Sequence, residues 1–311
     1  MAVIVESLEQ AEAAGPLHLA LGMFDGVHLG HQAVIESAVH SARRTGGQAG
    51  VLTFDPHPST LFRPSNPTRL LQTRGVKEHL LRERGVELII FQRFTAEFAG
   101  VESAQFPLML RSHLPTLRSL HIGENFRFGR GRQGNVSALI EACQPLNIGV
   151  FSVERIKHNG EPISSTRIRE SLAEGSLEEV NELLGYTYFS LGPVIPGRQL
   201  GRTLGFPTLN VRWSPESRPR LGVYAVRVRR DTPNSMWENA VANFGLRPTV
   251  ENAVVEPLLE IHALCDTKLS TGDQLIIEWM QFLRPEQKFE SLDALKEQIA
   301  QDKAVAIKLL A

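Results

Sequence analysis

The residues best suited to chemistry lie between Gly22 and His31, in the run Gly-Met-Phe-Asp-Gly-Val-His-Leu-Gly-His. His28 and His31 are three residues apart and can face the same side of a first helical turn, where imidazole N–H groups would donate to phosphate oxygens. The run therefore predicts a nucleotide site that stabilises phosphate charge as pyrophosphate leaves. Its candidate phosphate-binding residues are Gly22, Phe24, Asp25, Gly26 and Gly30.

Two other interpretations of these histidines are open. A single histidine is more often a turn cap or a surface residue, but the whole ten-residue run favours the nucleotide site. A zinc site is the second alternative, because His28, His31 and His57 could supply three ligands. The run lacks both the i, i+4 spacing and the adjacent glutamate of HExxH, so the metal site is the less favoured interpretation.

Two more polar runs support a phosphate site. Residues 53–58, Thr-Phe-Asp-Pro-His-Pro, follow an apolar run, and residues 163–169 open a helical pattern with three hydroxyls followed by two arginines. Hydroxyls, free helix amides and guanidinium groups together suit a polyphosphate. A stiff turn and an ordinary helix N-cap are the alternatives. The candidate phosphate contacts in these runs are His57, Ser164, Ser165, Thr166 and Arg167.

Residues 123–134 are too rich in glycine and aromatic residues for a plain connector. A flat ring could lie on Phe126 or Phe128, and Asn125 could hydrogen-bond the edge of that ring. Alternatively, both phenylalanines pack back into the core. The position of this loop after a predicted strand favours a ligand contact.

These runs need a scaffold, and the first half of the chain alternates short apolar runs with helix-period segments. The predicted strands are residues 17–24, 49–54, 87–94, 118–123 and 148–153. The predicted helices are residues 31–44, 76–85, 103–114 and 135–146. The alternation predicts an α/β domain with a parallel sheet and helices on both faces. Ligands of such sheets collect at the carboxyl ends of strands, where the polar runs stand.

The pattern changes after Ser164. Two short helices over residues 164–185 are predicted to close the first domain. Shorter strands separated by Gly, Pro and Asn then predict a small antiparallel β-barrel. Residues 291–310 predict a C-terminal amphipathic helix with Leu292, Leu295, Ile299 and Ala306 on its apolar side. We therefore expect two domains, residues 1–185 and 186–311.

The composition excludes several classes of protein. With 33 basic and 34 acidic residues, the net charge of -1 provides no global positive field for a nucleic acid. No apolar run approaches a membrane span, and the first residues lack the pattern of an export signal. The two cysteines form no CxxC motif. We expect a cytoplasmic enzyme for small anionic ligands, without nucleic-acid or membrane partners.

Four runs of the first half, GMFDGVHLGH, TFDPHP, IGENFRFGRGRQG and ISSTRIR, resemble in their order the adenylyltransferase domain of the prokaryotic bifunctional riboflavin kinase/FAD synthetase family. Residues 201–210, GRTLGFPTLN, resemble the signature of its riboflavin kinase half, and GVYAV, NFGLRPT, LEIH and RPEQKF follow in the family's order. The resemblance covers nearly the whole chain. It implies a Rossmann-like nucleotidyltransferase domain, then an antiparallel six-stranded β-barrel with a C-terminal helix.

The resemblance also implies roles for residues of the second half. Thr208 and Asn210 are expected to hold Mg²⁺ and ATP phosphates, with Gly205 among the ATP contacts, since phosphoryl transfer needs charge neutralisation more than covalent help. Glu260 is the expected general base for the terminal hydroxyl of the flavin, and Arg284 is expected to contact the flavin. Strand alternation alone would equally make Glu260 a solvent-facing residue.

The resemblance implies two reactions. Riboflavin and ATP would give FMN in the barrel, and FMN with a second ATP would give FAD and pyrophosphate in the first domain. Three other functions are possible. The first is an adenylyltransferase with an inactive barrel, because residues 268–272 lack an aromatic residue that is common in relatives. The others are a non-catalytic flavin-binding module and an adenylyltransferase for another substrate. The GFPTLN run disfavours the last. We expect riboflavin, FMN and ATP as substrates, and a monomer or weak homo-oligomer.

Overall fold

The computed structural model describes residues 2–197, 205–248 and 255–311. Contacts divide the chain into two compact units, Met1–Ser165 and Thr166–Ala311. Helix α7 (Ser165–Glu174) begins at the boundary between the units, and α8 (Leu177–Leu184) lies in the second unit. Helix α8 packs against a barrel strand, where the Asn181 side chain donates to the Trp279 carbonyl. The expectation that both helices close a first domain of residues 1–185 stays a prediction.

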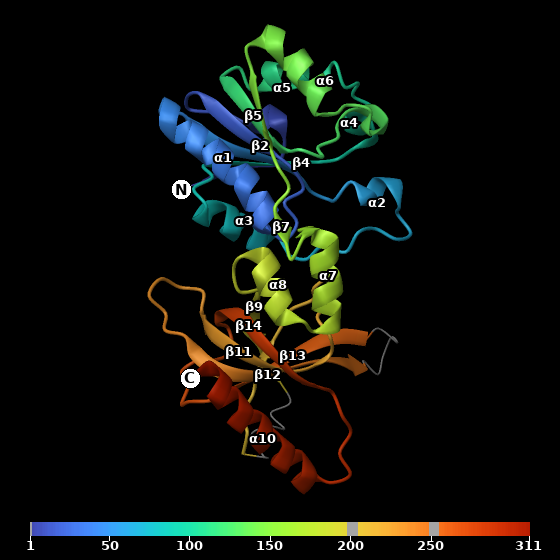
Figure 1. Cartoon of the computed structure of the whole chain (residues 1–311). Helices are drawn as coiled ribbons and strands as arrows, with labels where there is room; N and C mark the ends of the chain where they lie inside the picture. Colours follow the sequence, from blue (N-terminus) through green and yellow to red (C-terminus); the bar gives the residue numbers. More distant parts are fainter. Residues whose placement is uncertain (1, 198–204, 249–254) are drawn as a thin grey trace. The chain divides into compact units, whose positions relative to one another are not determined.

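The first unit contains a parallel sheet with the strand order β1-β4-β3-β2-β5-β6 (Figure 1). Its strands are β1 (Val3–Val5), β2 (Leu17–Leu21), β3 (Gln48–Phe54), β4 (Leu88–Gln92), β5 (Leu117–Gly123) and β6 (Gly149–Val153). Every residue of β2 and β4 is buried, which explains why their sequences are mostly apolar. The sequence predicted all of these strands except β1, which pairs in parallel with β4.

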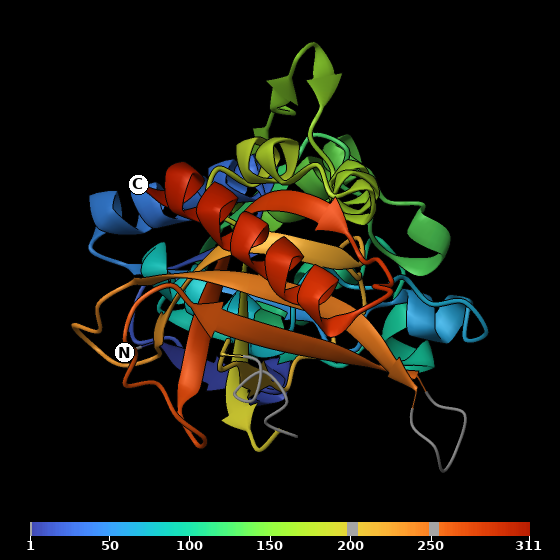
Figure 2. The ribbon, with the colours of Figure 1, turned by 90° about the horizontal axis from the view of Figure 1, so that it is seen from below.

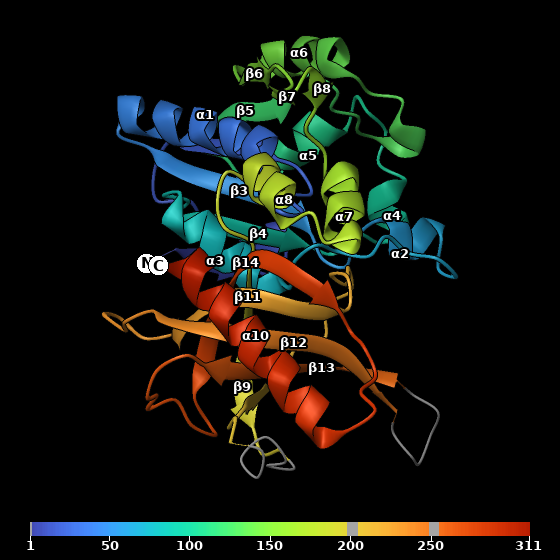
Figure 3. The same cartoon turned by 60° about the horizontal axis from the view of Figure 1, so that its bottom comes forward.

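Helices cover both faces of this sheet, as the alternation of side chains requires. On one face, α1 contacts β2, β3 and β5, and on the other Leu17, Leu19 and Leu21 join a core with Phe106 and Leu139. The longer helices are α1 (Leu29–Thr45), α3 (Arg74–Glu83), α5 (Phe106–His113) and α6 (Val136–Cys143) (Figure 3). Shorter elements are η1 (Leu8–Gln10), α2 (Ser59–Phe62), α4 (Ala96–Ala99), η2 (Arg130–Arg132), η3 (Gln144–Leu146) and a hairpin of β7 (Lys157–His158) with β8 (Glu161–Pro162).

The order of the strands reverses between β2 and β5. From β2 the chain adds β3 and β4 on one side, and it then returns to add β5 and β6 on the other. In open α/β sheets the carboxyl ends of the two strands at such a reversal diverge and leave a crevice for a ligand. The fold therefore predicts the site next to the segments that leave β2 and β5.

The second unit contains a closed antiparallel barrel with the strand order β10-β13-β12-β11-β14-β9. Its strands are β9 (Phe189–Ile195), β10 (Leu209–Val211), β11 (Gly222–Arg230), β12 (Glu238–Pro248), β13 (Val255–Ala263) and β14 (Gln274–Pro285). Buried rings of Trp213, Tyr224, Phe244 and Trp279 pack together, with centroids of Tyr224 and Trp279 4.8 Å apart. The barrel is therefore a filled core, and a ligand must bind at its rim or outer face.

Helix α10 (Leu292–Leu310) closes the chain and packs on β12 and β11, lying across the barrel strands in Figure 2. The Ser291 hydroxyl begins the helix by accepting from the Ala294 N–H. The predicted apolar side is only partly correct, because Ala306 is buried whereas Leu292 is 64% exposed. A charged residue, Asp302, is buried on the face toward the barrel.

Candidate active sites

The HxGH run leaves the carboxyl end of β2 at the strand reversal and enters α1. The Phe24 and Val27 backbones have φ of 48° and 35°, in the left-handed region that is unfavourable for both residue types. Both side chains are fully buried. Such backbone strain persists only where the surrounding structure enforces it, and it is frequent at functional sites.

Hydrogen bonds from three directions hold this turn. The Met23 carbonyl accepts from the Thr53 hydroxyl and from the Lys77 ammonium, both at 3.0 Å. The Asp25 carboxylate accepts from the Leu71 N–H at 2.9 Å, and the Asp25 carbonyl accepts from the Ser165 hydroxyl at 2.9 Å. Predicted phosphate contacts at Asp25 and Ser165 thus serve as supports of the turn, and Asp25 is only 2% exposed.

Packing accounts for the predicted glycines and for Phe24. A Cβ on Gly22 would lie 3.0 Å from the Phe24 ring, and a Cβ on Gly30 would lie 3.2 Å from the His28 ring. Gly26 has φ of 83°, which only glycine adopts at low cost. Phe24 is 1% exposed and supports the His31 ring, so it does not provide an open surface for a nucleotide.

The two imidazoles lie against each other at the start of α1. Their ring centroids are 3.6 Å apart and the rings are nearly parallel. His28 is the N-cap residue, and its Nδ1 accepts from the His31 N–H at 3.3 Å. The buried Nδ1 of His31 has no hydrogen-bond partner among the residues that the structure describes. This atom is suited to a ligand that would bind at the helix N-terminus.

Burial keeps both imidazoles neutral near pH 7. It lowers the pKa of His28 to about 4, and a backbone hydrogen bond offsets only part of that effect. The pKa of His31 lies well below its ordinary value because of burial first, then of repulsion from His28 and Lys77. Since Nδ1 of His28 accepts a hydrogen bond, the proton of its neutral ring resides on Nε2. A bound polyphosphate would favour a further proton at this site.

The other predicted phosphate ligands of the first domain are engaged locally. His57 Nδ1 accepts from the N–H of Ser59, the first residue of α2, at 3.0 Å. Arg167 lies in the second unit, where its guanidinium donates to Glu179 on α8 at 2.6 and 3.1 Å. The sequence favoured a phosphate contact for both residues, and the structure instead gives their side chains structural partners. Ser164 and Thr166 flank Ser165 at the start of α7.

The aromatic loop after β5 divides its two phenylalanines. Phe128 is 6% exposed and packs in the core against Phe106, as in the alternative interpretation, so little of its ring is available for the expected flavin contact. Phe126 stacks on Phe128 at 5.8 Å and is half-buried, and Asn125 is exposed. These last two residues stand at the carboxyl end of β5, across the strand reversal from the histidines.

A row of aromatic rings, which the sequence did not predict, extends from this loop. Ring-to-ring contacts continue from Phe106 to an exposed ring on α2. The row consists of Phe106, Phe98, Phe54, Phe94 and Phe62. Phe62 is 63% exposed, which is unusual for so large an apolar side chain and makes it a candidate contact for a flat ring. Its only signal in the sequence is its place soon after TFDPHP.

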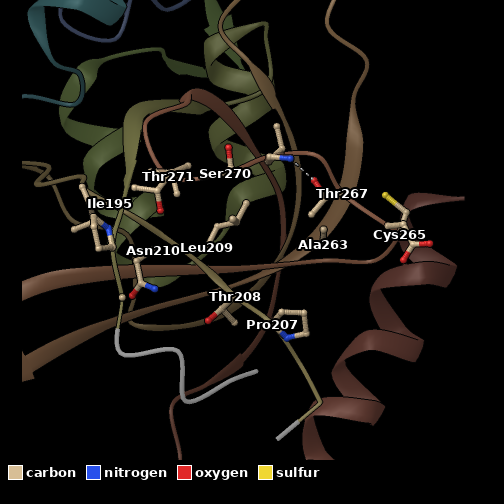
Figure 4. A pocket seen from close by; sticks show the side chains of 15 residues that line it. Ile195, Pro207, Thr208, Leu209, Asn210, Ala263, Cys265, Thr267, Ser270 and Thr271 are labelled. Carbon is tan, nitrogen blue, oxygen red and sulfur yellow. Dashed lines mark hydrogen bonds between the residues drawn. The ribbon is translucent and has the colours of Figure 1, made fainter. Parts of the chain in front are cut away.

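The barrel carries a pocket of about 500 Å³ beside β10 (Figure 4). Thr208 and Asn210 line it, as the sequence predicted for a shared site, and Thr271 and Ser270 face them from the loop before β14. The Ser270 N–H donates to the Asp273 carboxylate at 2.8 Å, which closes that loop as a turn. Gly205 has φ of 88° in the segment before Pro207, and Gly201 to Leu204 of the signature lie outside the described residues.

Glu260 stands beside Asn210 in the barrel wall. The register of β13 places Glu260 opposite Asn210 on β10 and opposite Asn243 on β12. Directly opposite residues of antiparallel strands share a face, and the neighbours Leu259 and Ile261 are fully buried in the interior. Glu260 therefore belongs to the outer face with Asn210, although it does not line the pocket itself.

Arg284 has a structural role that differs from the predicted flavin contact. Its guanidinium binds the Asp302 carboxylate through Nε and Nη2, with distances of 2.8 to 3.1 Å. The two side chains are 18% and 7% exposed. This pair attaches α10 to β14, so the charge of Arg284 is already neutralised within the protein.

Among the described residues, no group of three His, Cys, Asp or Glu side chains is arranged to hold a metal ion. Thr208 and Asn210 instead offer a hydroxyl and an amide oxygen, donors that suit Mg²⁺. In the same parts of the chain, no helix is long and apolar enough to cross a membrane.

The first unit carries an HxGH turn at the strand reversal of its parallel sheet, and the barrel presents a Pro-Thr-Leu-Asn segment at a pocket. Together these features define a two-site transferase that acts on phosphate groups. Comparisons with known families specify it. The FAD synthetase family matches residues 10–167, and the riboflavin kinase family matches residues 184–310. The chain belongs to the bifunctional riboflavin kinase/FMN adenylyltransferase family, and it has both transferase activities.

Relatives from several bacteria match this chain over most of its length. The chain is 36% identical to the bifunctional riboflavin kinase/FMN adenylyltransferase of Escherichia coli K12, over 97% of this chain and 95% of the relative. The Haemophilus influenzae protein of the same name is 38% identical over 91% of each chain. A crystal structure described as a macrolide-efflux protein from Streptococcus pneumoniae superposes with a TM-score of 0.87, at 25% identity over 98% of both chains.

Proposed function

We propose that the two activities occupy separate sites, with adenylyl transfer to FMN at the HxGH turn and phosphorylation of riboflavin at the pocket beside β10. The observation that carries the first assignment is the buried Nδ1 of His31, which lacks a hydrogen-bond partner within the described part of the chain. It lies beside the neutral ring of His28 at the N-terminus of α1. Polyphosphate binds helix N-termini through free amides and the helix dipole. Stabilising the charge of the phosphates at this site requires no covalent intermediate with the protein.

At this site the chain positions and stabilises the reacting phosphates. The Nε2–H of neutral His28 donates a hydrogen bond to a phosphate oxygen, and His31 takes up a proton as negative charge builds on the departing pyrophosphate. The FMN ring lies near the exposed Asn125 and the half-buried Phe126, with the exposed Phe62 as a further contact. An oxygen of the FMN phosphate attacks the α-phosphorus of ATP. One phosphoanhydride bond forms between the two, the α–β phosphoanhydride bond of ATP breaks, and pyrophosphate leaves.

In the barrel, Thr208 and Asn210 would hold Mg²⁺ with the ATP phosphates, and Gly205 would lie along them. The ion supplies charge neutralisation for the γ-phosphoryl group when bound. Glu260, on the same outer face as Asn210, accepts the proton of the ribityl hydroxyl that attacks. The expected substrates are riboflavin, FMN and ATP, and we expect a cytoplasmic monomer or weak homo-oligomer, whose size gel filtration would measure.

A flavin assay tests the separation of the sites. Purified protein is incubated with riboflavin and MgATP, and riboflavin, FMN and FAD are resolved by chromatography. His31→Ala is expected to form FMN but not FAD, whereas Glu260→Ala is expected to convert supplied FMN to FAD but to form no FMN. Loss of both activities in either folded variant would contradict separate sites, and circular dichroism checks that each variant is folded.

A further inference from the structure

Lys77 is a buried cation in the first unit that no motif drew attention to. It lies on α3, on the side of Val76, Leu80 and Leu81, and is 3% exposed. Lysine is almost never fully buried, because removing an ammonium group from water costs several kcal/mol. A lysine kept in such a position therefore makes interactions that offset this cost.

One such interaction is with the turn that carries the histidines. The Lys77 ammonium donates to the Met23 carbonyl at 3.0 Å, and the Thr53 hydroxyl donates to the same oxygen at 3.0 Å. Met23 directly precedes Phe24, the first of the residues with a left-handed backbone. Fixing the carbonyl of Met23 fixes the peptide plane from which this strained turn begins.

A second interaction acts through charge. Besides burial, the groups that lower the pKa of His31 are His28, from the N-cap of α1, and Lys77, from α3. The nearby Phe24 ring is uncharged, and the Asp25 carboxylate in the same turn accepts from the Leu71 N–H. The Lys77 charge therefore acts on His31, and a positive charge close to the phosphate site also favours a polyphosphate ligand.

We propose that Lys77 is a positioning residue for adenylyl transfer, which holds the Met23 carbonyl so that the HxGH turn presents His31 to the phosphates. This inference rests on the assignment of adenylyl transfer to the HxGH turn. It assigns a role to a side chain on a different helix from the histidines. Lys77 contacts the backbone of the turn that carries His31, and its charge adds to the effect of burial and of His28 on that ring.

Two substitutions at Lys77 and one control test this role. In Lys77→Met, which keeps the length of the stem, kcat for FAD formation from FMN is expected to fall by about tenfold to a hundredfold, because misplacing a reacting group by ~1 Å has an effect of that size. The KM for FMN changes little, and FMN formation in the barrel is unchanged. Lys77→Arg keeps the charge and recovers part of the rate. Arg82→Met, which removes a charge from an exposed position on α3, has no effect.

A histidine titration separates positioning from a merely structural role. By NMR with ring-labelled histidine, assigned through His31→Ala, the pKa of His31 is expected to rise in Lys77→Met because a nearby positive charge is lost. Thr53→Val removes the other donor to Met23 without a change of charge, so it lowers kcat without raising that pKa.

The outcomes are distinct. FAD formation by Lys77→Met within twofold of the parent, or an unchanged pKa of His31 in that variant, would overturn the proposal. If Lys77→Met does not fold, the Thr53→Val and Lys77→Arg variants test the proposal in its place. A parental kcat for FAD formation in Thr53→Val would then overturn the role of the Met23 carbonyl. A His31→Ala variant that still forms FAD would contradict the site assignment itself, independently of Lys77.

Discussion

A buried hydrogen-bond chain makes the first unit sensitive to acid. His121 on β5 is fully buried, and its two ring nitrogens hydrogen-bond the Ser37 and Ser119 hydroxyls, both at 2.8 Å. Ser119 in turn contacts Nδ1 of His18 at 2.6 Å. The His121 ring also stacks on Phe151 with centroids 4.8 Å apart. Serine hydroxyls donate as well as accept, so this chain can be satisfied with both imidazoles neutral.

The magnitude follows from the pKa of His121. Burial lowers it from 6.5 to about 4, with a smaller contribution from His18. Below the ordinary value the unfolded chain binds a proton that the folded chain excludes, so stability is lost as the pH falls from 6.5 toward 4. At about 1.4 kcal/mol per pKa unit the full loss approaches ~3 kcal/mol, of which about 2 kcal/mol falls between pH 7 and pH 5.

The assay compares the pH dependence of unfolding in two variants. His121→Gln cannot titrate, and it is expected to lose about 2 kcal/mol less than the parent between pH 7 and pH 5. His40→Gln, an exposed position on α1, is the matched control and should keep the parental dependence. Because His28 also has a pKa of about 4, only the difference between variants is assigned to His121.

The distribution of aromatic residues supplies separate probes for the two units. All tryptophans and tyrosines lie after residue 185, so tryptophan fluorescence follows only the second unit during urea denaturation. Hydrogen exchange measured on peptides from residues 2–165 follows the first. If the His121→Gln variant kept the full acid sensitivity of these peptides, the explanation through the buried ring would be refuted.

Two further predictions concern the structural ion pair of the second unit and a glycine of the HxGH turn. Asp302→Asn leaves the Arg284 guanidinium without its carboxylate, so the second unit should lose about 3 to 5 kcal/mol of unfolding free energy, measured by tryptophan fluorescence. Asp293→Asn, at an exposed position on the same helix, is the control. Equal losses in the two variants would refute the stabilising role of the Arg284–Asp302 pair. Gly30→Ala brings a Cβ to 3.2 Å from the His28 ring, so FAD formation should fall while FMN formation persists. An unchanged rate of FAD formation would show that the ring tolerates displacement.

Much of the architecture could be predicted from local patterns. Strands such as β2 and β4 are buried on both faces, so their sequences are mostly apolar and can be recognised without knowledge of their neighbours. The HxGH run could be identified because glycines and histidines at fixed spacing within ten residues indicate a turn. The three-residue strand β1 was missed, because only its pairing with β4, over eighty residues away, makes it a strand.

What the tertiary structure alone decided is which of the candidate side chains are free for a ligand. Phe126 and Phe128 look equivalent in sequence, yet the packing of Phe106 buries the second. Arg284 looks like a substrate contact until Asp302, on another element, neutralises it. Local sequence determines the backbone pattern and the chemistry of each side chain. Whether that chemistry is available depends on burial and charge contributed by residues distant in sequence, which only the folded chain brings together.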